Sequence, residues 1–231
     1  MTLQLTEYPS REALMQGAAE RMAAALNAGI GKRGHAAIAL SGGGTPEPAY
    51  RLLAQQQVDW SKVTLALVDE RFVPPTSEHS NEALVRRSLA PAIAAGARLA
   101  PMYADVASLE AAAERADALY APLELDFALM GMGGDGHTAS WFPGTPGLTA
   151  ALDPANPNTV IAVRAPLASG TPERLTLTLA AVARAGETAL LITGEDKRAR
   201  LAQALKAPLA EGPAAALFAP PMRAPSVLWA A

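Results

Sequence analysis

The segment "LMGMGGDGHTASWFPG", residues 129–144, follows an apolar run and contains the spacing G-x-G-x-x-G. In a dinucleotide-binding unit this spacing opens a helix of about three turns, and an acidic residue ends the next strand about 20 positions later. Here helix breakers crowd positions 143–147, and Asp153 lies in the turn-like stretch "ALDPANPN" rather than at a strand end. The segment therefore predicts a glycine-rich loop with chemistry of its own, carried by Asp135 and His137.

Short apolar stretches alternate with helical patterns along the rest of the chain. This alternation predicts a mostly parallel sheet with helices on both faces, that is, a doubly wound, Rossmann-like α/β fold. Without an internal repeat or a low-complexity linker, the sequence favours a single domain over residues 1–231. The expected strands are 36–40, 63–68, 98–102, 125–130, 159–165, 173–179, 188–193 and 226–230.

Composition excludes several classes of function. Half of the residues are hydrophobic and 18% are charged, so a sizeable core is expected. The absence of cysteine excludes disulfides, thiolate catalysis and cysteine-ligated metals. The net charge of −3 argues against a nucleic-acid partner, no apolar run is long enough to span a membrane, and the N-terminus lacks the layout of a signal peptide. We therefore expect a cytoplasmic monomer or small homo-oligomer that binds a small molecule.

Polar or glycine-rich clusters follow four of the expected strands. Ligands of doubly wound sheets bind beyond the carboxyl ends of the strands, so these clusters are expected to meet at one edge. The clusters are "SGGGT" (41–45), "DER" (69–71), "GMGGDGH" (131–137) and "GEDK" (194–197).

The first cluster is predicted to bind a phosphate group. Its glycines let backbone N–H groups converge on an anion, and the N-terminus of the following helix favours negative charge. We expect Thr45 to cap that helix, with Pro46 in its first turn. An ordinary strand-to-helix turn would use the same residue types, and the Lys-Ser/Thr pair of nucleotide hydrolases does not follow. The predicted loop consists of Ser41, Gly42, Gly43, Gly44 and Thr45.

Charged residues in the other clusters extend this anion site. Arg71 has the forked guanidinium that suits a phosphate or a polarised carbonyl, while Asp69 and Glu70 could orient a base or bind hydroxyl groups. Lys197 lies near a helix N-terminus, where a ligand anion would offset its unfavourable interaction with the helix dipole. Arg174 is a further candidate. For each of these side chains the alternative is a solvated surface charge.

His137 is the candidate general base. It lies on a glycine-rich loop at the expected ligand-binding edge, and an imidazole titrates near neutral pH. Asp135 could orient it or bind substrate hydroxyl groups. Ser140 lies outside a G-x-S-x-G elbow and no H-E-x-x-H spacing is present, so neither a serine nucleophile nor a catalytic metal is predicted. The alternative for His137 is a structural position in the loop.

With these clusters in view, the chain resembles the 6-phosphogluconolactonases, the lactone hydrolases of the oxidative pentose phosphate pathway. Related aminosugar-phosphate deaminases carry "DEY" in place of "DER" and an Asn-Glu-Pro end in place of "WFPG". An acidic residue usually precedes "SN", whereas here His79 does, so the contribution of position 79 is open. The matching segments run in family order and are "ALSGGGTP" (39–46), "VDERFVP" (68–74), "SN" (80–81), "GMGGDGHTASWFPG" (131–144), "PERLTLT" (172–178) and "TGEDK" (193–197).

The resemblance implies a fold of the sugar-phosphate isomerase/lactonase type and hydrolysis of 6-phospho-D-glucono-1,5-lactone to 6-phosphogluconate. It implies no metal and no organic cofactor, and it implies that His137 activates water. The implied catalytic group is His137, Asp135 and Arg71. The implied phosphate ligands are Ser41, Gly42, Gly43, Gly44, Thr45, Lys197 and Arg174, and the residues expected beside the substrate or directly behind it are Asp69, Glu70, Asn81 and Gly133.

Two functions of other classes remain open. A sugar-phosphate deaminase or isomerase would use the same pocket for proton transfer at carbon, and release of ammonia from glucosamine 6-phosphate would reveal it. A non-enzymatic sugar-phosphate sensor would keep the phosphate loop and lose the base. The presence of His137 and the lack of a DNA-binding element argue against the sensor.

Overall fold

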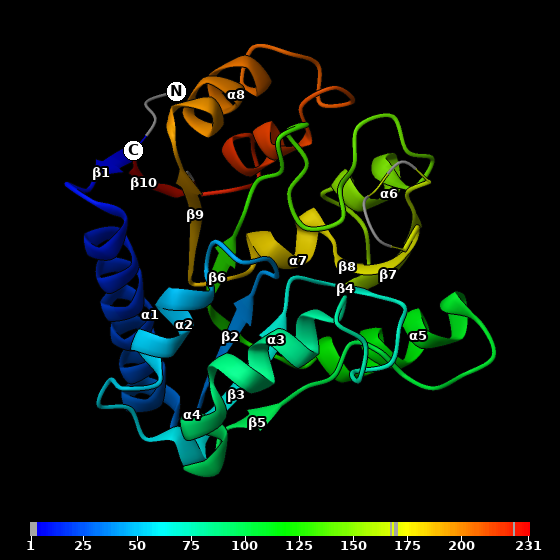
Figure 1. Ribbon diagram of the computed structural model, residues 1–231. Coiled ribbons are helices and arrows are strands. Elements are labelled where there is room, and N and C mark those ends of the chain that lie inside the picture. The colour runs from blue at the N-terminus through cyan, green and yellow to red at the C-terminus, as the bar shows by residue number, and fades with distance from the viewer. Residues whose placement is uncertain (1–3, 167, 169–170, 224) are drawn as a thin grey trace.

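Seven strands form one parallel sheet in the computed structural model, which describes residues 4–166, 168, 171–223 and 225–231 (Figure 1). Every pair of neighbouring strands runs parallel, so the predicted α/β fold is confirmed. In order across the sheet, the strands are β1 (Gln4–Glu7), β10 (Ser226–Ala230), β9 (Glu187–Thr193), β6 (Leu125–Met130), β2 (Ala36–Leu40), β3 (Val63–Leu67) and β5 (Arg98–Leu99).

The direction in which the sheet grows reverses between β2 and β6. From β2 the chain adds β3 and then β5 on one side, after which β6 pairs with the other side of β2 and β9 and β10 follow beyond it. A reversal of this kind opens a crevice between the two loops that leave the neighbouring strands. The loops that leave β2 and β6 here are the two glycine-rich clusters of the sequence.

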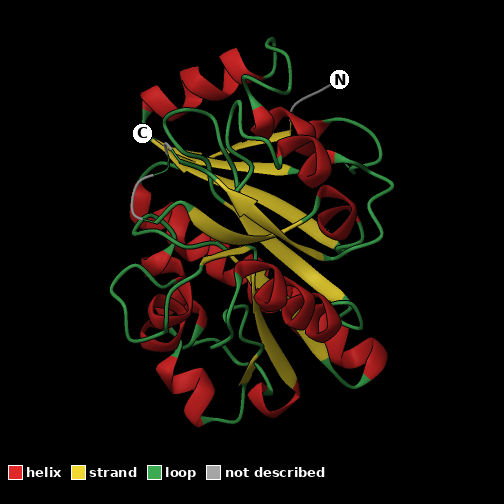
Figure 2. Cartoon of the chain, turned by 90° about the vertical axis from the view of Figure 1, so that its right-hand side faces the viewer, coloured by secondary structure: helices red, strands yellow, loops and turns green. Residues whose placement is uncertain are grey.

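Helices cover both faces of the parallel sheet (Figure 2). On one face the long α1 packs against β2, β6, β9 and β10. Within the described part of the chain, no helix combines the length and the apolar character needed to cross a bilayer. The α-helices are α1 (Arg11–Arg33), α2 (Glu47–Leu53), α3 (Asn81–Ser88), α4 (Ala90–Ala94), α5 (Leu109–Tyr120), α6 (Leu148–Leu152), α7 (Leu179–Ala183) and α8 (Glu195–Ala204), and short 3-10 helices occupy Trp60–Lys62 and Pro213–Phe218.

A small antiparallel sheet lies on the side of the parallel sheet away from α1 (Figure 1). Its strands are β4 (Asp69–Arg71), β8 (Glu173–Leu177) and β7 (Val160–Arg164), with β8 in the middle. The sequence places residues 69–71 after the expected strand 63–68 and does not predict β4, because three charged residues are too few to show a strand period. The connection from β7 to β8, residues 165–172, is shorter than the dozen or so residues that a parallel crossover needs, and the two strands pair antiparallel.

Buried apolar side chains hold the parallel sheet rigid. All five residues of β2 are buried, and Ile38 pairs with Leu65 of β3 and Phe127 of β6. Burial of a large apolar side chain contributes about 1.5–3 kcal/mol to stability. The well-packed strands therefore fix the positions from which the loops at the carboxyl edge of the sheet begin.

Candidate active site

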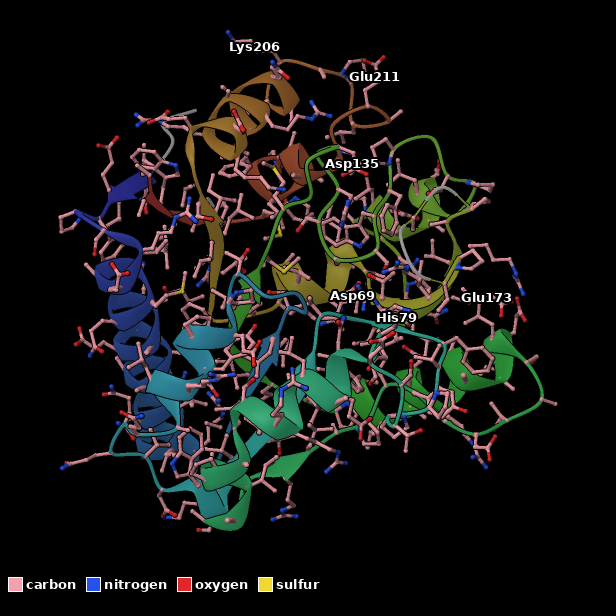
Figure 3. All side chains as sticks on the ribbon, in the orientation of Figure 1. Asp69, His79, Asp135, Glu173, Lys206 and Glu211 are labelled. Atoms are coloured by element: carbon pink, nitrogen blue, oxygen red, sulfur yellow. The ribbon has the colours of Figure 1, made fainter. Side chains whose placement is uncertain are left out.

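A cavity of about 270 Å³ lies at the carboxyl edge of the parallel sheet, beside the reversal point. We call one side the main-sheet wall; it consists of the loops after β2, β6 and β9, with Lys197 at the start of α8. The other side, the small-sheet wall, consists of Asp69, Arg71 and Arg174; Figure 3 labels Asp69 near β4 and Asp135 on the loop that leaves β6. The predicted residues that line the cavity are Ser41, Gly42, Gly43, Thr45, Asp69, Arg71, Asn81, Gly133, His137, Arg174 and Lys197.

His137 and Asp135 form a hydrogen-bonded pair on the loop after β6. The Nδ1 atom of His137 lies 2.6 Å from Oδ1 of Asp135, and the backbone N–H of His137 donates to the same oxygen at 3.1 Å. Burial opposes ionisation of Asp135, but the hydrogen bonds from His137 outweigh it and lower the pKa of the Asp135 carboxyl to about 2. Asp135 does not line the cavity, so its contact is with the imidazole and not with the cavity.

Gly133 lets the imidazole fold back over its own loop. The N–H of Gly133 donates to the carbonyl of His137 at 2.8 Å, and the N–H of Gly136 donates to the carbonyl of Gly133 at 3.1 Å. A Cβ atom on Gly133 would lie 2.2 Å from the His137 ring, closer than any side chain permits. The glycine spacing therefore serves the close approach of His137, and the chain does not enter a helix until α6. This explains the G-x-G-x-x-G pattern without a dinucleotide.

The loop after β2 packs tightly against α3. A Cβ atom on Gly42 would lie 1.9 Å from Oδ1 of Asn81, and the buried Tyr50 hydroxyl donates to the carbonyl of Ser41 at 2.7 Å. The prediction that Thr45 caps α2 was wrong. Residues 44–46 form a turn, Pro46 takes the cap position and no side chain caps the helix. Gly44 of the same loop does not line the cavity.

Two arginines lie directly opposite each other on the small-sheet wall. Arg71 of β4 pairs with Arg174 of β8 in the antiparallel register. Arg71 donates through Nη1 to the carbonyl of His79, and within the described residues its buried Nε has no hydrogen-bond acceptor. Burial lowers the pKa of Arg174, Asp69 opposes that change and Arg71 adds to it. Position 79 thus contacts Arg71 through its backbone carbonyl, a contact that does not require a particular side chain.

The two carboxylates of the "DER" cluster differ in their surroundings. Asp69 lines the cavity and accepts a hydrogen bond from Ser140 Oγ at 2.6 Å, while the amide of Asn81 donates to its carbonyl at 2.8 Å. Glu70 is fully buried and does not line the cavity. It accepts hydrogen bonds from the Ser80 hydroxyl and from the N–H groups of Asn81 and Glu82 at the start of α3. Glu70 therefore fixes α3 to β4 and does not face a ligand.

Lys197 enters the cavity from the first turn of α8. Its Nζ donates to the carbonyl of Met132 at 2.8 Å, which ties the loop after β6 to α8. Burial lowers the pKa of Lys197, and the nearby Asp135 carboxylate opposes this change. The side chain thus contacts the loop that carries His137 as well as the cavity.

Three residues with supporting contacts were not assigned from the sequence. The sequence argues against Ser140 as a nucleophile and indicates no other role for it, yet its hydroxyl donates a hydrogen bond to the carboxylate of Asp69. Arg200 of α8 donates through Nη2 to the carbonyls of Asp135 and Glu211, so it connects the loop that carries His137 to residue 211. Phe142 contacts both His137 and Arg174. A serine, an arginine and a phenylalanine at these positions carry no pattern that separates such contacts from ordinary packing.

Comparison with known proteins identifies the family that carries this site. Residues 9–229 match the family of glucosamine-6-phosphate isomerases/6-phosphogluconolactonase. A 6-phosphogluconolactonase from Rhizobium meliloti is 46% identical over 204 residues, which cover 87% of this chain and 86% of that protein. The chain belongs to the 6-phosphogluconolactonase family. Another member of that name, from Mesorhizobium japonicum, is 42% identical over 225 residues and covers 96% of this chain and 93% of its own.

A solved structure agrees with this family membership. The crystal structure of a 6-phosphogluconolactonase from Shewanella baltica matches with a TM-score of 0.91 and 31% identity, over 100% of this chain and 98% of that one. The resemblance drawn from the sequence segments is therefore confirmed.

Proposed function

We propose that this lactone hydrolase opens the ring of 6-phospho-D-glucono-1,5-lactone with a water molecule that His137 activates. One observation carries the proposal. The bonded pair of His137 and ionised Asp135 lies at a cavity that also receives three cationic side chains. A base next to an anion-binding cavity suits an ester substrate that bears a phosphate group. The three cations are Arg71, Arg174 and Lys197.

The bond to Asp135 defines which nitrogen of His137 acts. An ionised carboxylate can only accept a hydrogen bond, so Nδ1 of His137 must carry the proton that lies between the two groups. The neutral imidazole then keeps its lone pair on Nε2, which is the nitrogen available to a water molecule. General-base catalysis of this kind accelerates a reaction by about 10²–10⁴-fold.

The proposed reaction proceeds in two steps. Nε2 of His137 takes a proton from water while the water oxygen bonds to the lactone carbonyl carbon, which gives a tetrahedral intermediate. The bond between that carbon and the ring oxygen then breaks, and the imidazolium returns its proton to the departing ring oxygen. The products are a carboxylic acid, which ionises in water, and a free hydroxyl group, so no metal or redox partner enters the balance.

The phosphate group is proposed to bind between the two walls. Arg71 and Arg174 lie opposite each other. The buried Nε of Arg71 has no hydrogen-bond acceptor among the described residues, so a phosphate oxygen could accept from it. Lys197 and the N–H groups of the 41–45 loop contribute from the main-sheet wall. Bonds between such cations and phosphate oxygens are charge-assisted and roughly twice as strong as neutral ones. Asp69 is then proposed to accept a hydrogen bond from a sugar hydroxyl.

The test of this function is lactone consumption measured against spontaneous hydrolysis. We expect His137→Asn to remain folded and to lower the catalysed rate by at least about 10²-fold, because the base is lost. His35→Asn is the matched control, since His35 is an exposed residue before β2, at the other end of the strands. A folded His137→Asn variant with a near-wild-type rate contradicts the assignment of the base.

Two further assays separate the alternatives. Release of ammonia from glucosamine 6-phosphate, with no consumption of lactone, would indicate a deaminase. Tight binding of 6-phosphogluconate without turnover of either substrate would indicate a sensor. Either result overturns the proposed reaction while leaving the fold and the anion-binding cavity in place.

A further inference from the structure

We propose that Phe142 is a positioning residue that holds the base His137 and the cation Arg174 in register across the two walls of the cavity. The proposal rests on the assignment of His137 as the base. It adds a residue that touches neither the substrate nor the reacting atoms, because Phe142 does not line the cavity.

The backbone that carries Phe142 is fixed on both sides. Thr138 and Trp141 form an isolated antiparallel bridge, so the chain after His137 turns back at once. The indole Nε1 of the fully buried Trp141 donates to the carbonyl of Leu177 at 2.8 Å, which anchors this turn on β8. The hydroxyl of Thr145 donates to the carbonyl of Phe142 at 2.9 Å. The position of the phenyl ring is thus set by the fold and not by a ligand.

The phenyl ring contacts one functional group from each wall. Its centroid lies 4.3 Å from the centroid of the His137 ring, with 31° between the two planes. The guanidinium carbon of Arg174 lies 5.1 Å from the same phenyl centroid. Phe142 is 6% exposed, so it makes these contacts out of water. No other aromatic ring among the described residues is recorded in contact with both groups.

The contact supplies a constraint that Asp135 alone cannot supply. A single hydrogen bond to Nδ1 fixes one atom of the imidazole but allows the ring plane to rotate about that bond. Packing against a rigid aromatic face restricts the plane, so the two contacts together aim Nε2. The face of a phenyl ring also carries partial negative charge, which favours a cation beside it. Phe142 therefore favours both the imidazolium that forms during turnover and the guanidinium of Arg174.

The experiment compares Phe142→Leu with Phe142→Tyr in the full chain. Leucine keeps apolar bulk and removes the aromatic face, whereas tyrosine keeps the face. We expect Phe142→Leu to lower kcat by about tenfold, because loss of aim at the reacting atoms is costly, and Phe142→Tyr to stay within about twofold of wild type. Rates are corrected for the folded fraction, and Phe127→Leu, the same change in the sheet core, is the control for lost packing. Phe142→Met serves if the leucine variant does not fold.

Proton NMR of the imidazoles gives a readout that does not depend on turnover. The chain has three histidines, so His137→Asn identifies the signal of His137 by its loss. We expect Phe142→Leu to move that signal, because the ring current of the phenyl group beside the imidazole is lost, and to leave the signals of His35 and His79 in place. The charged groups around the ring are Asp135 on its own loop, Lys197 from α8 and Arg174 beyond the phenyl ring, and all three are retained in the variant.

The outcomes distinguish the inference from the proposed function. If Phe142→Leu, or Phe142→Met in its place, keeps the wild-type kcat after correction for the folded fraction, Phe142 is only packing and the inference fails. If Phe127→Leu lowers the folded-fraction-corrected kcat as much as Phe142→Leu does, the loss reflects general packing and the inference also fails. An active His137→Asn variant overturns the proposed base itself, whatever Phe142 variants do.

Discussion

The two walls of the cavity are built on opposite principles. The main-sheet wall consists largely of glycine-rich backbone: the loops after β2 and β6 pack so closely that Gly42 and Gly133 leave no room for a Cβ atom. The small-sheet wall is made of side chains, with Arg71 and Arg174 paired across two strands and Asp69 beside them. The main-sheet wall positions His137 by close packing of the backbone, and the small-sheet wall positions charged side chains by strand register.

This difference predicts how each wall responds to mutation. The backbone of the main-sheet wall should be sensitive to added volume, because its groups are positioned by close contact, whereas Lys197 on the same wall should respond to loss of charge. A side-chain wall should lose ligand affinity when a cation is removed and keep its shape. Substitutions that add one methyl group or remove one charge therefore test the comparison directly.

The largest effect is expected from Gly133→Ala. The added Cβ would lie 2.2 Å from the His137 ring, so the ring must move. A displacement of about 1 Å at a reacting group can cost about 10²-fold in rate, and we expect a loss of kcat of that order with little change in KM. Gly134→Ala is the matched control, because its Cβ would meet only Lys197 Nζ, at 3.9 Å. Equal kcat values for the two variants would show that the backbone does not hold the base.

Removal of a cation should act on binding. Calorimetric titration is expected to show that Lys197→Ala and Arg71→Ala each weaken binding of 6-phosphogluconate by about 1.5–3 kcal/mol, the contribution of a charge-assisted hydrogen bond. Binding of gluconate, which has no phosphate, should change little. Lys206→Ala is the control, since Lys206 is exposed beyond the end of α8 (Figure 3). A variant that binds the phosphate product as tightly as wild type removes its residue from the phosphate site.

Disturbing the contact between the two walls should lower the free energy of unfolding. Gly42→Ala would place its Cβ 1.9 Å from Oδ1 of Asn81. The amide Nδ2 of the same Asn81 donates to the carbonyl of Asp69 on the small-sheet wall. Overpacking of this kind costs about 1–3 kcal/mol, and urea unfolding should show a loss in that range. Gly44→Ala meets nothing within 4 Å and should change the free energy of unfolding by less than about 0.5 kcal/mol. A neutral Gly42→Ala would mean that the two walls are not packed against each other.

The smallest effect concerns pH. Because the pKa of Asp135 is lowered to about 2, this carboxylate stays ionised throughout the range from pH 4 to pH 8. Its bond to His137 would be lost only as the pH falls toward 2, so Asp135 adds no step to the profile above pH 4. After subtraction of the background, the pH profile of kcat should therefore show no step from Asp135 between pH 4 and pH 8. A step in that range that is absent from Asp135→Asn would show that Asp135 titrates there.

The sequence predicts how the main-sheet wall comes together, whereas for the small-sheet wall it predicts the residues but not their pairing. Apolar strands followed by glycine clusters are local signals, and parallel strands bring their carboxyl ends together by topology alone. The pairing of Arg71 with Arg174 joins residues far apart in the chain through the register of a three-residue strand, and no local pattern contains it. Glu70 shows the same limit, because a buried carboxylate that caps a helix has the same sequence context as one that binds a ligand.

Errors at the loop ends have a similar physical cause. Thr45 is a suitable cap by residue type, but the chain turns before the helix begins and Pro46 takes that position. Ser140 and Phe142 lie in the segment that identifies the family, yet their contacts depend on the turn between Thr138 and Trp141. Side-chain partners across such a turn are decided by tertiary packing and not by spacing.

Because Arg71 and Arg174 lie opposite each other, the anions in the surrounding solution affect the stability of this protein. Two like charges directly opposite each other on antiparallel strands repel, which lowers the stability of the fold. The loss is larger when salt screens the charges less. Any anion that settles between the two guanidinium groups offsets the repulsion and favours the folded state by mass action. Inorganic phosphate in a buffer would therefore stabilise the fold and at the same time compete with the substrate. A buffer anion that binds at this pair would therefore raise thermal stability and lower the rate of turnover.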